Sequence, residues 1–135
     1  MILTGAFKQV RDKMQKKAYG ANPETAFAEA CEARDFSRLL FISGQVPQKG
    51  DHIPDNYPDQ YRLAWANVEA QLVAAGMSFD NLIKATIFLS DRSLIAQSGG
   101  LRHSILGERT PAITIVLTGI YDERWLLEIE AVAAA

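Results

Sequence analysis

The sequence predicts an α+β domain in which two helices cover one face of a mixed β-sheet. Apolar residues recur at helical spacing from Tyr61 to Ala75, and less regularly between Asp91 and Leu106. Strand-like runs lie before, between and after these two segments. The resulting order of strand, helix, strand, helix, strand, strand is typical of helices packed on one side of a sheet.

The first strand and the first helix are predicted from short signals. Leu39 to Ser43 is an apolar run that ends at Gly44, and a loop rich in proline, glycine and aspartate follows it. Pro58 suits the first turn of a helix and Gly76 suits the position just after its end. The residues that form the apolar face of this helix are Tyr61, Ala64, Trp65, Val68, Leu72 and Ala75.

The middle of the chain predicts a strand and a weaker helix. From Ile83 to Leu89, alternate residues are apolar and share one face. The helix from Asp91 to Leu106 can be capped by Ser90 or Asp91. It contains Gly99-Gly100, and each glycine costs about 1 kcal/mol relative to alanine in a helix. Either the helix breaks there, or another segment packs close to its backbone.

Two strands, Ile113–Leu117 and Trp125–Val132, end the chain. In the second, Leu126, Glu128, Glu130 and Val132 share one face of the strand. Helices on one side of the sheet leave its other side uncovered, and the remaining elements are too few to cover it. The sequence therefore predicts oligomerisation.

Composition excludes several classes of function. The 135 residues predict one domain, residues 27–135, after a basic N-terminal extension, residues 1–26. The extension is expected to be a solvated tail, with an arm for an anionic partner as the alternative. A net charge of −2 and the lack of a long apolar run predict binding to neither nucleic acid nor a membrane. The single cysteine, Cys31, permits no intrachain disulfide and favours a reducing, cytoplasmic location.

No cofactor or metal is expected. The two histidines, His52 and His103, lie in different elements without a second ligand nearby, and no glycine-rich phosphate loop is present. Cys31 is either a nucleophile or a small buried hydrophobe. Glu128 lies mid-strand between apolar residues, where a buried carboxylate needs a partner. It is either a general acid or base, or an outward-facing surface residue like Glu130.

Four stretches together resemble the RidA family, also called YjgF/YER057c/UK114. They are LLFISGQVP (39–47), WANVEAQLVAAGMSFDNLIKATIFLSD (65–91), PA before a strand (111–112) and LEIEAVA (127–133). The resemblance implies a chorismate-mutase-like sandwich and a homotrimer with clefts between subunits. It also implies hydrolysis of reactive enamines and imines, such as 2-aminoacrylate, to a 2-keto acid and ammonia, without a cofactor.

The resemblance also implies site residues. Deaminating members carry an arginine for the substrate carboxylate directly after the proline-alanine pair, where this chain has Ile113. Gly99 stands where those members have an asparagine. Glu128 matches the family's glutamate, and Gly44 matches its cleft glycine. Ile115, on the strand that Ile113 begins, completes the apolar side of the predicted substrate-binding group.

The family's N-terminal tyrosine corresponds to Phe27 if three residues are inserted between Arg34 and Arg38, and to Ala30 without a gap. With Ile113 in place of arginine, a carboxylate would need another cation. Arg102 is placed in the substrate-binding group for this reason. The other candidates are Arg109 and a neighbouring subunit's Arg34 or Arg38. For each of the four arginines, however, a solvated surface role is expected ahead of a role in substrate binding.

Three functions follow from this sequence. The first is a Rid-type hydrolase with specificity altered away from 2-imino acids, in which Glu128 positions water or protonates the departing nitrogen. The alternative is a non-catalytic trimer that binds a small metabolite. A third, ribonuclease activity, is disfavoured because the chain is slightly acidic and has no basic-aromatic patch.

Overall fold

The computed structural model describes residues 13–135 of the chain. These residues form six strands, two α-helices and three short 3₁₀ turns. The strands are β1 (Gln15–Tyr19), β2 (Ala30–Arg34), β3 (Leu39–Gln45), β4 (Leu82–Leu89), β5 (Ala112–Leu117) and β6 (Leu127–Ala134). The helices are α1 (Tyr57–Ala74) and α2 (Ile95–Leu106), and the 3₁₀ turns are Pro23–Thr25, Phe79–Asn81 and Arg92–Leu94.

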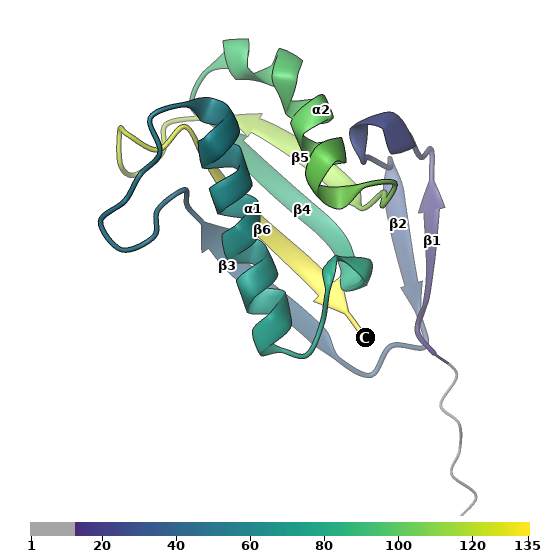
Figure 1. The fold of residues 1–135 in the computed structure, drawn as a ribbon. Helices are drawn as coiled ribbons and strands as arrows, with labels where there is room; N and C mark the ends of the chain where they lie inside the picture. Colours follow the sequence, from purple (N-terminus) through teal and green to yellow (C-terminus); the bar gives the residue numbers. More distant parts are fainter. Residues whose placement is uncertain (1–12) are drawn as a thin grey trace, which may run out of the picture.

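The main sheet has four strands in the order β3-β6-β4-β5. β4 and β5 run parallel, whereas β6 pairs antiparallel with both β3 and β4, so the sheet is mixed. Both helices lie on the same face of this sheet (Figure 1). The predicted α+β class, with two helices on one face of a mixed sheet, is therefore confirmed.

The core lies between α1 and the sheet. Tyr61, Trp65 and Leu72 are fully buried along the face that helical periodicity predicts. The predicted ends also hold, because Pro58 lies in the first turn of α1 and Gly76 follows the cap residue with a φ of +71°. The helix begins before the first residue of the apolar pattern because the Asn56 side chain accepts a hydrogen bond from the backbone N–H of Asp59 at 2.9 Å.

The weaker helix is continuous through its two glycines. Asp91 caps the 3₁₀ turn that leads into α2 by accepting from the Ser93 backbone N–H at 2.7 Å. A Cβ atom on Gly99 would lie 3.1 Å from Cγ2 of Thr25. Close packing of another segment, the second of the two predicted explanations, therefore accounts for Gly99. Nothing in the structure explains Gly100, which has open space beside it.

A hairpin of β1 and β2 was not among the predicted elements. The two strands pair antiparallel, with Lys17 opposite Glu32, and their side chains are mostly exposed. The expectation of a solvated tail is wrong for residues 15–19, which form β1. Lys8 and Arg11, the first basic residues of the predicted extension, lie outside the described residues.

The face of the sheet opposite the helices carries no helix or strand from residues 13–135 (Figure 1). Phe41 is 73% exposed on this face. A groove of about 350 Å³ runs beside it, lined by side chains of β3, β4 and β6 that include Lys84, Thr86 and Glu130. In the described part of the chain, no helix is long and apolar enough to cross a membrane.

Candidate functional site

Glu128 and Gly44 face each other across β6 and β3. A Cβ atom on Gly44 would lie 1.9 Å from Oε1 of Glu128 and 2.9 Å from its Cγ. The glutamate side chain therefore occupies the space that any other residue at position 44 would fill. The ladder between the strands shifts register between Ile42 and Gln45, which places Gly44 in a β-bulge. Bulges often redirect a side chain beside a functional site.

Strand alternation decides which face Glu128 occupies. Its neighbours Leu127 and Ile129 are fully buried toward the helices, so Glu128 points to the opposite, helix-free face, where it is half-buried. Across the ladder it lies opposite Phe88 on β4. Glu128 therefore faces outward like Glu130, but it is half-buried where Glu130 is exposed.

Ile113 and Ile115 point the other way. Ile113 pairs with Ala85 and Ile115 with Ile87 on β4, and both partners are fully buried beneath the helices. Ile113 is 8% exposed and belongs to the main hydrophobic core. One chain therefore presents Glu128 and Ile113 on opposite faces of its sheet and does not bring them into one pocket.

Most of the predicted substrate-binding residues meet around the segment from Thr25 to Ala28. The backbone N–H of Ala28 donates to the carbonyl of Pro111 at 3.0 Å, which places Phe27 next to the start of β5. Gly99 packs against Thr25 from the side of α2. Ala30, the alternative to Phe27, is exposed at the start of β2. The group thus combines Phe27, Gly99, Ile113, Ile115 and Arg102 on the helix-bearing side.

Arg102 is buried, and the expectation of a solvated surface arginine is wrong for this residue. It is 4% exposed, and its Nε donates to the carbonyls of Thr25 at 2.8 Å and Ala26 at 3.2 Å. Its Nη1 is buried without a hydrogen-bond partner. None of the ion pairs among residues 13–135 includes Arg102. The guanidinium therefore holds the backbone of the 3₁₀ turn and is enclosed away from solvent.

The other candidate cations are exposed but already have partners. Arg109 pairs with Asp80 at 2.7 Å. Arg34 pairs with Glu32 at 2.6 Å, and Arg38 donates to the carbonyl of Ala75 at 2.9 Å. A substrate carboxylate would have to compete with these partners for any of the three.

Two tyrosines lie between the helices. The hydroxyl groups of Tyr57 and Ser98 are hydrogen-bonded at 2.7 Å, and burial raises the pKa of Tyr57 to about 12. Burial also raises the pKa of Tyr61, although the nearby Arg102 guanidinium opposes this shift. Both phenols are therefore protonated at neutral pH, and neither supplies a base there.

Cys31 and the histidines offer little chemistry. Burial raises the pKa of the Cys31 thiol, although the neighbouring Lys16 opposes the shift, so little reactive thiolate is present at neutral pH. A ring nitrogen of His103 lies 2.8 Å from the carbonyl of Pro23. Within residues 13–135, no group of three or more histidine, cysteine or acidic residues gathers as a metal site.

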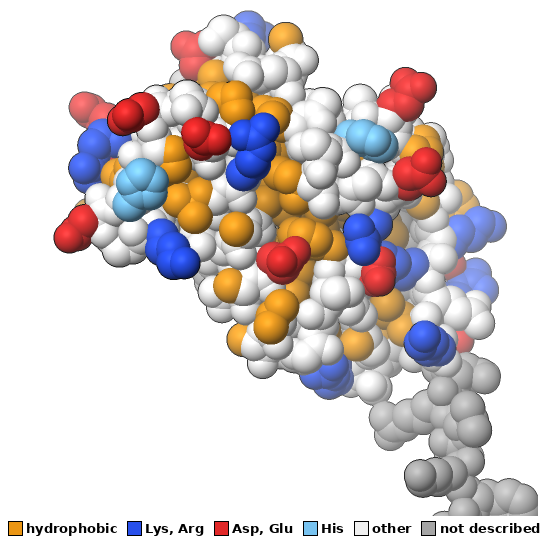
Figure 2. Space-filling view, in the orientation of Figure 1, with side chains coloured by type: hydrophobic (Ala, Val, Ile, Leu, Met, Phe, Trp, Pro, Cys, Tyr) orange, Lys and Arg blue, Asp and Glu red, His pale blue; other side chains and the backbone are white. Residues whose placement is uncertain are grey.

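Charges on the helix-bearing face are mixed. In Figure 2, acidic and basic side chains are intermingled around exposed apolar groups, and neither sign gathers into a patch on the face shown. A nucleic acid would bind best along a continuous basic track. The face seen in Figure 2 therefore offers no such track.

A buried polar network behind the site was not found from the sequence. Gln60 on α1 is 2% exposed, and it hydrogen-bonds the loops that adjoin β3 and β6. Asn67, on the same helix, donates to the carbonyl of Val46 at 2.8 Å. Gln60 lies next to Tyr61 and one turn before Ala64, at a position that the helical pattern predicts to be buried. A polar residue at such a position could have indicated the network from the sequence.

The sequence matches a family model described as endoribonuclease L-PSP over residues 19–135. RutC family protein PH0854 of Pyrococcus horikoshii is 33% identical over 82% of this chain and 88% of its own length. TdcF of Escherichia coli K12, provisionally described as a reactive intermediate deaminase, is 35% identical over 73% of this chain and 81% of its own length.

The chain is also similar to a relative whose name states its substrates, and to a protein of known structure. The 2-iminobutanoate/2-iminopropanoate deaminase of Escherichia coli K12 is 26% identical over 89% of this chain and 98% of its own length. A crystal structure of E. coli TdcF with bound serine superposes with a TM-score of 0.69 at 31% identity. The superposition covers 81% of this chain and 87% of that one.

Proposed function

The chain belongs to the endoribonuclease L-PSP family, which includes the Rid and YjgF proteins, and on that premise we propose that it hydrolyses a reactive enamine or imine. The observation that carries the proposal is the close contact of the half-buried Glu128 side chain with Gly44. Relatives described as deaminases act on the C=N bond of such compounds. The substrate proposed here differs from a 2-imino acid in lacking the carboxylate.

The proposed reaction needs one carboxylate and one water. Glu128 accepts a proton from water as the water oxygen bonds to the C=N carbon. The π electron pair moves to nitrogen, which takes up a proton from solvent. Glu128 then donates its proton to the amino nitrogen of the carbinolamine, and the C–N bond breaks as the hydroxyl proton is lost to solvent. Water and imine are thereby converted into a carbonyl compound and ammonia, with no cofactor required.

The proposed preference for imines without a carboxylate rests on Ile113 and on the arginines, which are buried or already have partners. An alkyl group at this position cannot bind a carboxylate bidentately as arginine does. Arg102 is enclosed, and Arg109, Arg34 and Arg38 each have partners. Because a hydrogen bond to a charged group contributes about 1.5–3 kcal/mol, the lack of an anchor should weaken 2-imino acid binding by about 10- to 100-fold.

We place the reaction in a cleft between subunits of a homotrimer. The opposite orientations of Glu128 and Ile113 support this placement, because residues on both faces can contribute to one site only across an interface. The exposed Phe41 on the uncovered sheet face supports an assembly as well. A cytoplasmic location belongs to the same proposal and is supported by the single, reduced Cys31.

Substrate preference tests the proposed function. We expect the protein to accelerate ammonia release from the aldimine that an amine oxidase makes from n-butylamine. It should do so at least tenfold more efficiently, in kcat/KM, than from 2-iminobutyrate made by an amino-acid oxidase. The initial rate of ammonia release, corrected for the rate without the protein, gives kcat/KM in each assay. Equal or better turnover of 2-iminobutyrate would show that another group replaces the missing arginine.

Melting temperatures measured on the same protein distinguish hydrolysis of a ligand from binding alone. A ligand that binds the folded protein raises its melting temperature whether or not it is consumed. If stable carbonyl products or amine analogues raise the melting temperature while no imine is turned over, hydrolysis is wrong. The non-catalytic, metabolite-binding alternative would then be favoured.

A further inference from the structure

Gln60 is a buried amide that lies behind the site. Its side chain comes from the first half of α1 and is 2% exposed. A buried primary amide loses its hydrogen bonds to water, so it is tolerated only where protein groups replace them. The partners of Gln60 therefore show what the residue holds in place.

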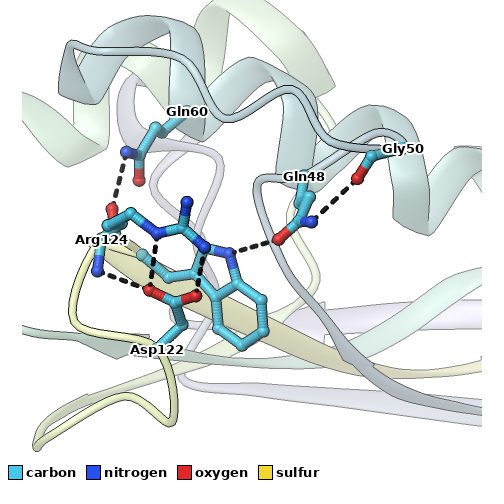
Figure 3. Close-up of polar contacts among 6 residues, drawn as sticks. Gln48, Gly50, Gln60, Asp122 and Arg124 are labelled. Carbon is cyan, nitrogen blue, oxygen red and sulfur yellow. Dashed lines mark hydrogen bonds and ion pairs between the residues drawn. The ribbon is translucent and has the colours of Figure 1, made fainter.

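Gln60 bridges two loops. Its Nε2 donates to the carbonyls of Pro54 at 2.9 Å and Arg124 at 3.0 Å. Its Oε1 accepts from the backbone N–H of Leu126 at 2.8 Å. Figure 3 shows the amide directed from α1 toward the backbone of Arg124. One side chain thus ties the loop after β3 to the loop before β6.

These contacts fix the residue immediately before β6. Leu126 is held on both sides, because its N–H donates to Gln60 and its carbonyl accepts from the Ser90 backbone N–H at 3.0 Å. Leu126 lies two residues before Glu128, immediately before the first residue of β6. The backbone that leads into β6 and Glu128 is therefore held in place at Leu126.

Further hydrogen bonds connect the loop after β3 with the loop before β6. The indole N–H of Trp125 donates to Oε1 of Gln48 at 3.0 Å, and Nε2 of Gln48 donates to the carbonyl of Gly50 at 2.8 Å (Figure 3). Arg124 also pairs with Asp122 at 2.7 Å, and its hydrogen bonds hold the pKa of Asp122 at about 2. The loop before β6 is thus tied both within itself and to the loop after β3.

We propose that Gln60 is a positioning residue that sets the Glu128 carboxylate against Gly44 by holding both loops to α1. The proposal rests on the proposed function, since it assigns Gln60 a role in that reaction. A displacement of about 1 Å in a reacting group can lower a rate about 100-fold. Loss of Gln60 should therefore act on the chemical step more than on substrate binding.

The test compares Gln60→Met with Gln71→Met. Methionine matches glutamine in length but makes none of its hydrogen bonds, and Gln71 is an exposed residue of the same helix. At a temperature where all variants are folded, we expect Q60M to lower kcat at least tenfold and to change KM less than threefold. Q71M should leave both constants unchanged.

A double mutant separates positioning from general damage. If Gln60 acts through Glu128, adding Q60M to Glu128→Gln should cause no further loss of kcat. The amide NMR signals of Gly44 and Glu128 should also shift in Q60M and stay in place in Q71M. If Q60M is not folded, Gln48→Met, which breaks the link to Trp125, replaces it and should show the same pattern.

Two results would overturn the assignment. Unchanged kcat and unmoved Gly44 and Glu128 signals, with only a lower melting temperature, would make Gln60 structural alone. A further loss of kcat in the double mutant would show that Gln60 acts by another route. If the unmutated protein turns over no imine, the proposed function fails, and the NMR shifts alone then decide whether Gln60 positions Glu128.

Discussion

Gly44→Ala is expected to lower kcat for imine hydrolysis by about 100-fold while reducing the free energy of unfolding by no more than about 1 kcal/mol. The alanine Cβ would lie 1.9 Å from Oε1 of Glu128 and 2.9 Å from its Cγ. Rotation of the carboxylate alone cannot relieve the contact with Cγ, so the whole side chain must change rotamer. The φ of Gly44 is not positive, and the backbone therefore accepts alanine.

Gly100→Ala is the matched control. Gly100 is a helical glycine with no atom near the position of an added Cβ. Alanine there should stabilise the protein by about 1 kcal/mol and leave kcat unchanged. Steady-state kinetics and chemical denaturation measure both effects. A Gly44→Ala protein with full activity would mean that the position of the Glu128 side chain does not matter to the reaction.

Arg102→Met is expected to lower the free energy of unfolding by about 2 kcal/mol. Two effects oppose each other. Removal of a buried guanidinium without an acidic partner relieves its desolvation, which favours folding. The carbonyls of Thr25 and Ala26, however, lose their donor, and Ala26 is held with a φ of +49°. We expect the second effect to be larger, because one buried acceptor, one half-buried acceptor and a strained residue depend on one side chain.

Arg62→Met provides the comparison for Arg102. Arg62 is an exposed arginine of α1 that pairs with Asp59 at 3.1 Å, and its loss should change stability by no more than about 0.5 kcal/mol. Thermal and urea denaturation of both variants measure the difference. An Arg102→Met protein as stable as the unmutated chain, or more stable, would show that desolvation dominates.

Much of the fold could be predicted because its elements have strong local patterns. The apolar face of α1 and the alternation in β6 each lead to one arrangement, and the structure has both. The β1–β2 hairpin has no such pattern, since its strands are short and mostly exposed. Its pairing depends on contacts between residues such as Lys17 and Glu32, which local periodicity does not reveal.

The site could be predicted only in part. The match of Glu128 and Gly44 to a family motif is a property of sequence, whereas their mutual contact depends on a bulge between two strands that are far apart in the chain. Burial of Arg102 could not be anticipated, because arginine is rarely enclosed without an acidic partner. Gln60 was missed because its three partners are backbone groups in two distant loops.

The most direct test of the central claim is ammonia release from the butylamine-derived aldimine by the unmutated protein, Glu128→Gln and Glu130→Gln. Glu130 lies on the same face of β6 and is exposed. Its replacement by glutamine makes the same chemical change as Glu128→Gln, a carboxylate to a neutral amide, but away from Gly44. Loss of a general acid and base should lower kcat by about 100-fold or more in E128Q and leave E130Q active. Equal activity in E128Q and the unmutated protein would contradict the assignment of Glu128 as the catalytic residue.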